Sequence, residues 1–230
     1  VAFDIVRKLR KTPVSAGVCD GFIGNRILKT YRQQAENLLL DGCIPSDVDM
    51  AMRDFGMSMG PFEAQDLGGL DIAFAQRQNI AKHNTPVYAP ISDILCQMKR
   101  FGQKTSGGWY DYVEGNRTPI ASDIVVEIIQ SERKIADRKI QKFTNEDIQK
   151  RILYPMINEA ILIIEEGIAK HPVDIDLVEV LGFGFPRWRG GLLHYADYVG
   201  LGDIQASLAT PCGLLNKLVN ENKSLATLNP

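Results

Sequence analysis

Cysteine is scarce in this sequence, and its placement argues against metal binding and against secretion. The 230 residues contain four cysteines, none in a C-x-x-C pair and none grouped with histidine at the spacing of a zinc site. The sequence therefore predicts no metal site, and it favours a reduced, cytosol-like compartment.

Long apolar runs and an excess of one charge are also missing. No run approaches the roughly 20 apolar residues of a membrane helix, and the first residues lack the apolar core of a signal peptide. The net charge of −2 comes without a basic arm or stripe, so we expect neither a membrane span, nor secretion, nor a nucleic-acid partner. Because the chain starts with valine, we interpret it as a fragment.

Helical patterns fill most of the chain. Apolar residues at helical spacing, together with caps and glycine stops, indicate an all-α fold. The Gly- and aromatic-rich segment 102–119, "GQKTSGGWYDYVEGNRTP", interrupts the pattern and is predicted to be an extended loop or a small hairpin. Helices are predicted over residues 27–39, 46–55, 61–67, 71–82, 91–100, 122–135 and 144–166.

Polar residues mark where several of these helices begin. Ser46, Ser122 and Thr144 are predicted N-caps, and Asp147 stands at the right distance from Thr144 for a capping box. Gly56 is predicted to end the helix that Ser46 begins.

An internal repeat organises the chain. We infer two copies of one helical unit, roughly residues 23–114 and 144–228, that pack as an internal pseudo-dimer imitating the self-complementary interface of a homodimer. The matches run in order: Arg26, Ile27, Leu28, Ala35 and Gly42 with Arg151, Ile152, Leu153, Ala160 and Gly167; Asp47, Val48 and Asp49 with Asp174, Ile175 and Asp176; Gly60, Asp66, Gly69 and Leu70 with Gly191, Asp197, Gly200 and Leu201.

The repeat distinguishes two neighbouring polar residues. Arg26 recurs as Arg151, which favours a structural role such as a salt bridge to an acid of the same repeat. Asn25 aligns with Lys150, so the common fold does not require an amide there. Asn25 is either the N-cap of its helix or a site residue.

Four motifs resemble a known family. "GFIGNRIL", "SDVDMAMRDFGMSMGPFEAQDLGGLD" and "GQKTSGGWYDY" resemble the C-terminal region of 3-hydroxyacyl-CoA dehydrogenases. "GFPRWRGGLLHYAD" resembles the multifunctional fatty-acid oxidation enzymes, which carry two such helical domains in tandem. The resemblance implies oxidation of the C3 hydroxyl of an L-3-hydroxyacyl-CoA, with hydride passing to NAD. It also implies a catalytic His, Glu and Ser in a Rossmann domain, and an Asn that maps onto Asn25.

The chain departs from that family in its dinucleotide site. It has no G-x-G-x-x-G turn of the kind that holds a pyrophosphate, and "GFGFPRWRG" at Gly182 has the wrong spacing. None of His83, His171 and His194 aligns with the catalytic base. NAD is therefore expected only in the complete enzyme, and the isolated chain is expected to be inactive.

The resemblance also implies substrate contacts. Phe22 and the "MGPF" residues Met59, Gly60, Pro61 and Phe62 are candidates for lining the acyl pocket, the alternative being plain core. Lys104 is a candidate for a CoA phosphate contact, the alternative being an exposed lysine with no specific partner. Arg187 and Arg189, which flank Trp188, are expected to pack against another domain or to contact CoA.

These predictions combine into one assignment. Residues 1–22 are interpreted as the last helix and strand of a dinucleotide-binding domain, 23–114 and 144–230 as the two helical domains, and 115–143 as a linking helix. The expected function is the substrate-side part of an NAD-dependent 3-hydroxyacyl-CoA dehydrogenase of β-oxidation. The expected partners are the acyl-CoA substrate, a Rossmann domain and an enoyl-CoA hydratase domain of the same polypeptide. The expected location is cytoplasmic or peroxisomal. The alternative is a non-catalytic helical dimerisation or interaction module.

Overall fold

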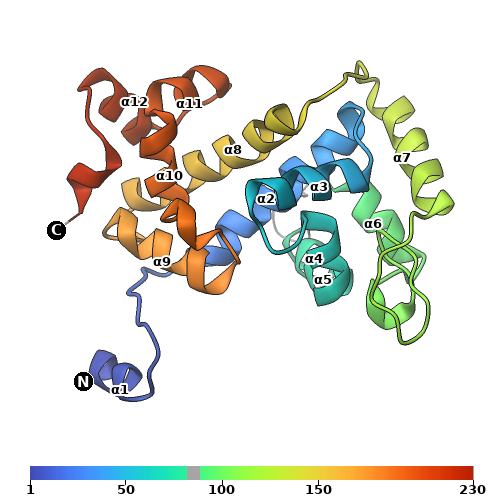
Figure 1. The fold of residues 1–230 in the computed structure, drawn as a ribbon, viewed down its shortest axis with the longest axis horizontal. Coiled ribbons are helices and arrows are strands. Elements are labelled where there is room, and N and C mark those ends of the chain that lie inside the picture. Colours follow the sequence, from blue (N-terminus) through green and yellow to red (C-terminus); the bar gives the residue numbers. More distant parts are fainter. Residues whose placement is uncertain (82–88, 230) are drawn as a thin grey trace. The chain divides into compact units, whose positions relative to one another are not determined.

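The regular secondary structure of the described residues is helical (Figure 1). The computed structural model describes residues 1–81 and 89–229, so the predicted helix end at Lys82 and the residue His83 lie outside the described residues. The described part contains twelve α-helices and three short 3-10 turns, with isolated antiparallel bridges in place of a sheet. This confirms the all-α prediction. No helix among the described residues is long and apolar enough to cross a bilayer.

The chain divides into two compact units. Val1–Thr30 with Leu153–Pro230 forms the first unit, and Tyr31–Ile152 forms the second. Two long helices, α2 (Gly24–Asp41) and α8 (Asn145–Glu165), each contribute residues to both units. The domain boundaries expected from the sequence remain a prediction.

The second unit is built on short helices that close around one apolar core. Along the chain α3 packs against α4, α5 against α6, and α6 against α7. The fully buried side chains of this core include Phe55, Phe62, Leu95, Trp109 and Ile129. The bounds are α3 (Pro45–Phe55), α4 (Pro61–Gly68), α5 (Leu70–Ala81), α6 (Pro90–Gln97), η1 (Gln103–Thr105) and α7 (Asp123–Ala136).

The first unit has its own core. Its central helix is α10, which packs against α9, α11 and η3. Residues 9–20 precede α2 without forming a helix, and the N–H of Gly17 donates to the carbonyl of Ile168 at 2.7 Å. The bounds are α1 (Ala2–Lys8), α9 (Pro172–Gly182), η2 (Arg187–Arg189), α10 (Leu192–Val199), α11 (Leu201–Ser207), α12 (Gly213–Asn220) and η3 (Leu225–Leu228).

Local capping agrees with the sequence at one helix start and differs at another. Thr144 and Asp147 exchange hydrogen bonds as a capping box before α8, at 3.2 Å from the Asp147 N–H to the Thr144 hydroxyl. The prediction for Ser46 is wrong, because α3 already begins at Pro45 with Ile44 as its cap. Proline suits the first helical turn because its φ is fixed and it has no N–H to leave unpaired.

Arginine and acid pairs connect the two sequence copies. In the first unit Arg26 forms ion pairs with Glu159 and, at 2.5 Å, with Glu166. In the second unit its counterpart Arg151 pairs with Asp41 at 2.5 Å. The acid partner of each arginine therefore lies in the other copy, and the prediction of an acid in the same repeat is wrong. Asp41 is the last residue of α2 and Glu166 directly follows the last residue of α8, so each copy supplies the acid for the arginine of the other.

Candidate functional site

The turn that precedes α2 has an unusual backbone. Gly21 has a φ of 77° and Phe22 a φ of 49°, both in the left-handed region. A Cβ on Gly21 would lie 2.9 Å from the backbone nitrogen of Arg26, so glycine is required there. The N–H of Phe22 donates to the carbonyl of Cys19 at 3.2 Å, which closes the turn.

Asn25 lies in the first turn of α2 with an exposed side chain. The helix already begins at Gly24, so Asn25 does not occupy the N-cap position that one of the two alternatives gave it. Gly24 packs against the ring of Phe183, which a Cβ would approach to 2.0 Å, and Arg26 is tied by its ion pairs. Asn25 is therefore presented to solvent from a backbone that is fixed on both sides. Unpaired N–H groups and the positive end of the helix dipole lie at this terminus, which favours negative charge on a nearby oxygen.

The "MGPF" residues separate into an exposed part and a buried part. Met59 is 40% exposed in the loop before α4, whereas Phe62 is completely buried. The ring of Phe62 lies 4.5 Å, centroid to centroid, from that of Trp109. Phe62 thus fills the core of its unit, as the alternative reading held, while an acyl-contact role for Met59 remains a prediction.

Two buried carboxylates, Asp49 and Asp66, hold the loops of this region in place. Asp49 on α3 accepts hydrogen bonds from the backbone N–H groups of Phe62 and Glu63 at 2.9 and 3.2 Å, and from the hydroxyl of Tyr110 at 2.6 Å. Burial raises the pKa of Asp49 to about 7, and these hydrogen bonds oppose the rise. In the second copy Asp176 likewise accepts two backbone N–H bonds at the start of α10, at 2.7 and 3.2 Å.

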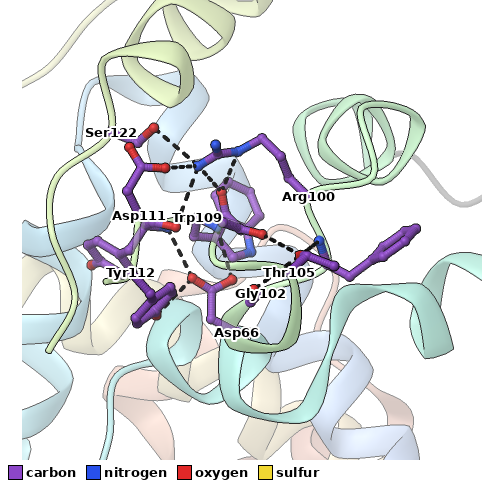
Figure 2. A network of polar contacts seen from close by, with 12 residues as sticks. Asp66, Arg100, Gly102, Thr105, Trp109, Asp111, Tyr112 and Ser122 are labelled. Atoms are coloured by element: carbon purple, nitrogen blue, oxygen red, sulfur yellow. Dashed lines mark hydrogen bonds and ion pairs between the residues drawn. The ribbon is translucent and has the colours of Figure 1, made fainter. Parts of the chain in front are cut away.

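Asp66 anchors the aromatic loop (Figure 2). Its carboxylate accepts hydrogen bonds from the N–H of Trp109 at 2.9 Å, the N–H of Tyr110 at 3.0 Å and the hydroxyl of Tyr112 at 2.9 Å. Arg100 secures the other side by donating to the carbonyl of Gly108 at 3.0 Å and to neighbouring acceptors. Trp109 and Tyr110 of this loop are buried.

The repeat showed that Asp49 and Asp66 recur as acids in the second copy, but it did not predict which backbone N–H groups they accept hydrogen bonds from. Asp197, the counterpart of Asp66, accepts from two backbone N–H groups at the start of η3, at 2.7 and 2.9 Å. The signal in the sequence for these structural carboxylates was an acid that recurs in both copies among apolar residues. Buried carboxylates that accept backbone N–H bonds stabilise the loops around a site without taking part in its chemistry.

Lys104 is already paired. Its ammonium lies 2.5 Å from the carboxylate of Asp71 and 5.8 Å from the centroid of the Phe101 ring. Half of its side chain remains exposed, so the ion pair is open to competition from a phosphate. A CoA contact by Lys104 remains a prediction.

The histidines within the described residues do not assemble a catalytic group. His171 Nδ1 lies 3.0 Å from the carbonyl oxygen of Leu228, and the ring of His194 packs beside Gly190. No cluster of histidine, cysteine and acidic residues in the described part of the chain is arranged to hold a metal ion.

The described residues do not form a dinucleotide-binding site. Residues 1–81 and 89–229 contain no parallel sheet and hence no strand, glycine turn and helix that would bind a pyrophosphate. The first helix, α1, is followed by a segment without strand pairing. No residue here is assigned to NAD.

The sequence patterns did not point to Glu179, which lies on α9. It is 2% exposed, and its Oε1 has no hydrogen-bond partner among the residues that the structure describes. Burial and the neighbouring Asp176 raise its pKa to about 8. The only signal was a single acid in the apolar run "VEVLGFGF".

Comparison with known proteins identifies the family. The sequence model of the 3-hydroxyacyl-CoA dehydrogenase C-terminal domain matches residues 21–112 and 148–224. The peroxisomal bifunctional enzyme of Cavia porcellus is 36% identical over 95% of the chain and 34% of its own length. That of Danio rerio is 37% identical over 87% of the chain and 30% of its length.

A solved structure agrees. The dehydrogenase part of multifunctional enzyme 1 from C. elegans superimposes with a TM-score of 0.67 at 27% identity, over 94% of this chain and 52% of that one. The chain spans about a third of the length of the two curated relatives named above. Matches to the family in two segments, in the order that the motifs predicted, show that this chain belongs to the 3-hydroxyacyl-CoA dehydrogenase C-terminal domain family.

Proposed function

We propose that this chain is the substrate-side helical part of an NAD-dependent L-3-hydroxyacyl-CoA dehydrogenase of fatty-acid β-oxidation. The main support for this proposal is that Asn25 presents an exposed amide on a rigid helix start, inside a segment that matches the dehydrogenase family. Its fixed neighbours Gly24 and Arg26 are explained by packing and ion pairing, whereas Asn25 is not.

Asn25 has the chemistry that the reaction needs at the C3 oxygen. As that hydroxyl loses its proton, negative charge develops on the oxygen, and an amide N–H together with the positive end of α2 favours it. The same amide can instead orient the catalytic histidine, which the resemblance places in the Rossmann domain. The base, its orienting glutamate and the NAD site belong to that domain in the family.

Replacing Asn25 in the complete enzyme tests the proposal. Asn25→Ala removes a donor that acts on developing charge, so we expect kcat to fall about 10²-fold, with a smaller change in KM. The matched control is Gln33→Ala, because Gln33 is another exposed amide on α2. A kcat for Asn25→Ala equal to that of the control would contradict the role.

The chain by itself should not turn over substrate. General-base catalysis needs a base within hydrogen-bond reach of the transferred proton, and hydride needs an acceptor site. Mixing the isolated chain with an L-3-hydroxyacyl-CoA and NAD should give no rise in NADH absorbance above a blank. Measurable turnover would overturn this expectation.

A second function is favoured by one surface of the second copy. Trp188 is 72% exposed, and the guanidinium of Arg189 stacks on its ring at 4.1 Å. Exposed tryptophan and arginine are typical of protein interfaces, which supports the alternative of an interaction module. Calorimetry with acetoacetyl-CoA separates the two, because only a substrate-side domain restores binding when combined with its Rossmann domain.

The relatives also bear on location and partners. Both curated relatives named above are peroxisomal, which favours the peroxisomal over the cytoplasmic alternative. Their description as bifunctional supports a second enzymatic domain in the same polypeptide, for which we propose the enoyl-CoA hydratase. Fluorescence microscopy of the complete tagged protein tests the location.

A further inference from the structure

Phe22 combines two features that each cost stability. A bulky side chain in the left-handed region, here at a φ of 49°, is sterically disfavoured. The ring is 54% exposed, so burial in this chain does not compensate for the strain.

The surrounding turn dictates this backbone but not the aromatic ring. The N–H of Phe22 donates to the carbonyl of Cys19, and the thiol of Cys19 lies 3.3 Å from the carbonyl of Phe22. Glycine or asparagine would adopt the same backbone with less strain. Strained residues of this kind cluster at ligand sites, where the surrounding structure holds them in place.

The position of the ring relates it to the candidate site. Phe22 precedes Asn25 by three residues, and both side chains are exposed at the start of α2. Gly24, which lies between them, is fixed against Phe183. The amide and the ring therefore belong to the same rigid helix start, one polar and one apolar.

We propose that Phe22 determines acyl-chain specificity, its ring contacting the methylene groups beyond C3 of the L-3-hydroxyacyl-CoA and so favouring longer chains. This rests on the proposed function, because it needs the C3 oxygen to lie at Asn25. A polar group at C3 and an apolar chain beyond it match the polar and apolar side chains of this helix start.

The test compares substrates of different length on the complete enzyme. Phe22→Asn keeps a residue that tolerates the left-handed backbone and removes the ring, and Phe22→Tyr keeps the ring. Each methylene removed from water changes affinity about fourfold, so losing contact with about two of them predicts about a fifteenfold fall. We expect that fall in kcat/KM for L-3-hydroxyhexadecanoyl-CoA with Phe22→Asn, and less than twofold for L-3-hydroxybutyryl-CoA.

Two controls separate a substrate contact from a structural role. Phe22→Tyr should retain the long-chain rate, and Tyr198→Asn, which removes an 83% exposed ring on α10, should leave both rates unchanged. The unfolding temperature of Phe22→Asn should equal or exceed that of the wild type, because the strain is relieved.

Three results would overturn the inference. They are an equal loss for both substrates, no loss for either, or a lower unfolding temperature with an unchanged ratio of the two rates. If Asn25→Ala still lowers kcat in the same preparation, the proposed function stands and only the role of Phe22 fails. A complete enzyme that oxidises neither substrate contradicts the proposed function itself.

Discussion

Replacing the buried carboxyl of Glu179 should change how stability depends on pH. Glu179 lies on α9, 2% exposed, and its Oε1 has no hydrogen-bond partner within the described residues. Burial is the main cause that raises its pKa to about 8, and the charge of Asp176 adds to it. In the unfolded chain the same group titrates near its ordinary value of 4.5.

The direction in which stability changes with pH follows from how many protons the folded and unfolded chains bind. Between pH 4.5 and about 8 the folded chain holds this proton and the unfolded chain releases it. Folding stability therefore falls as pH rises through this window. At about 1.4 kcal/mol for each pH unit, the full loss is about 5 kcal/mol, of which roughly half falls between pH 5 and pH 7.

Calorimetric unfolding of the chain and of Glu179→Gln at several pH values measures this effect. Glutamine keeps the shape and removes the titration, so the difference in unfolding temperature should move in favour of the variant by roughly 5–10 °C between pH 5 and pH 7. Glu127→Gln, at an exposed position on α7, tests whether removing any carboxylate has the same effect. Curves for the wild type and Glu179→Gln that stay parallel over this range would refute the reasoning.

Two further predictions concern residues that the repeat singled out. Asp66→Asn should destabilise the chain by about 3 kcal/mol, because three donors depend on this buried carboxylate. Asp197→Asn should cost only about 1 kcal/mol, because two donors depend on it and it is only half-buried. Urea unfolding measures both, and equal effects would contradict the comparison. Gly60→Ala should destabilise by at least about 2 kcal/mol, since its Cβ would lie 2.3 Å from the Cβ of Asp49. Gly182→Ala, with no atom within 4 Å of the added Cβ, should be neutral or stabilising, and a loss there comparable to that at Gly60 would show that steric contact is not the cause.

Local sequence patterns predicted most helices because the information is contained within a few turns of chain. The apolar stripe of residues 27–39 lies within α2, and the Thr144 and Asp147 pair caps α8 as expected. The error at Ser46 also has a local cause, since a good capping residue was preferred to the proline beside it. The family motifs around Asn25 are likewise contained in short stretches of sequence.

Other features depended on residues far apart in the chain. The sequence indicated that Arg26 and Arg151 share a structural role, but not that each finds its acid in the other copy. It grouped Met59 with Phe62, which the fold separates into an exposed and a buried side chain. Nothing in the pattern revealed that Oε1 of Glu179 has no hydrogen-bond partner within the described residues, or that Phe22 has a left-handed backbone.

The sequence by itself determined the helices, the repeat and the family, because periodicity, caps and motifs are properties of neighbouring residues. The tertiary structure alone decided which charges meet and which side chains stay exposed. Arg26 and Glu166 are 140 residues apart, and they pair because the fold of the first unit brings the end of α8 next to the first turn of α2. Burial and ion pairing are set by packing in space, which spacing along one helix does not encode.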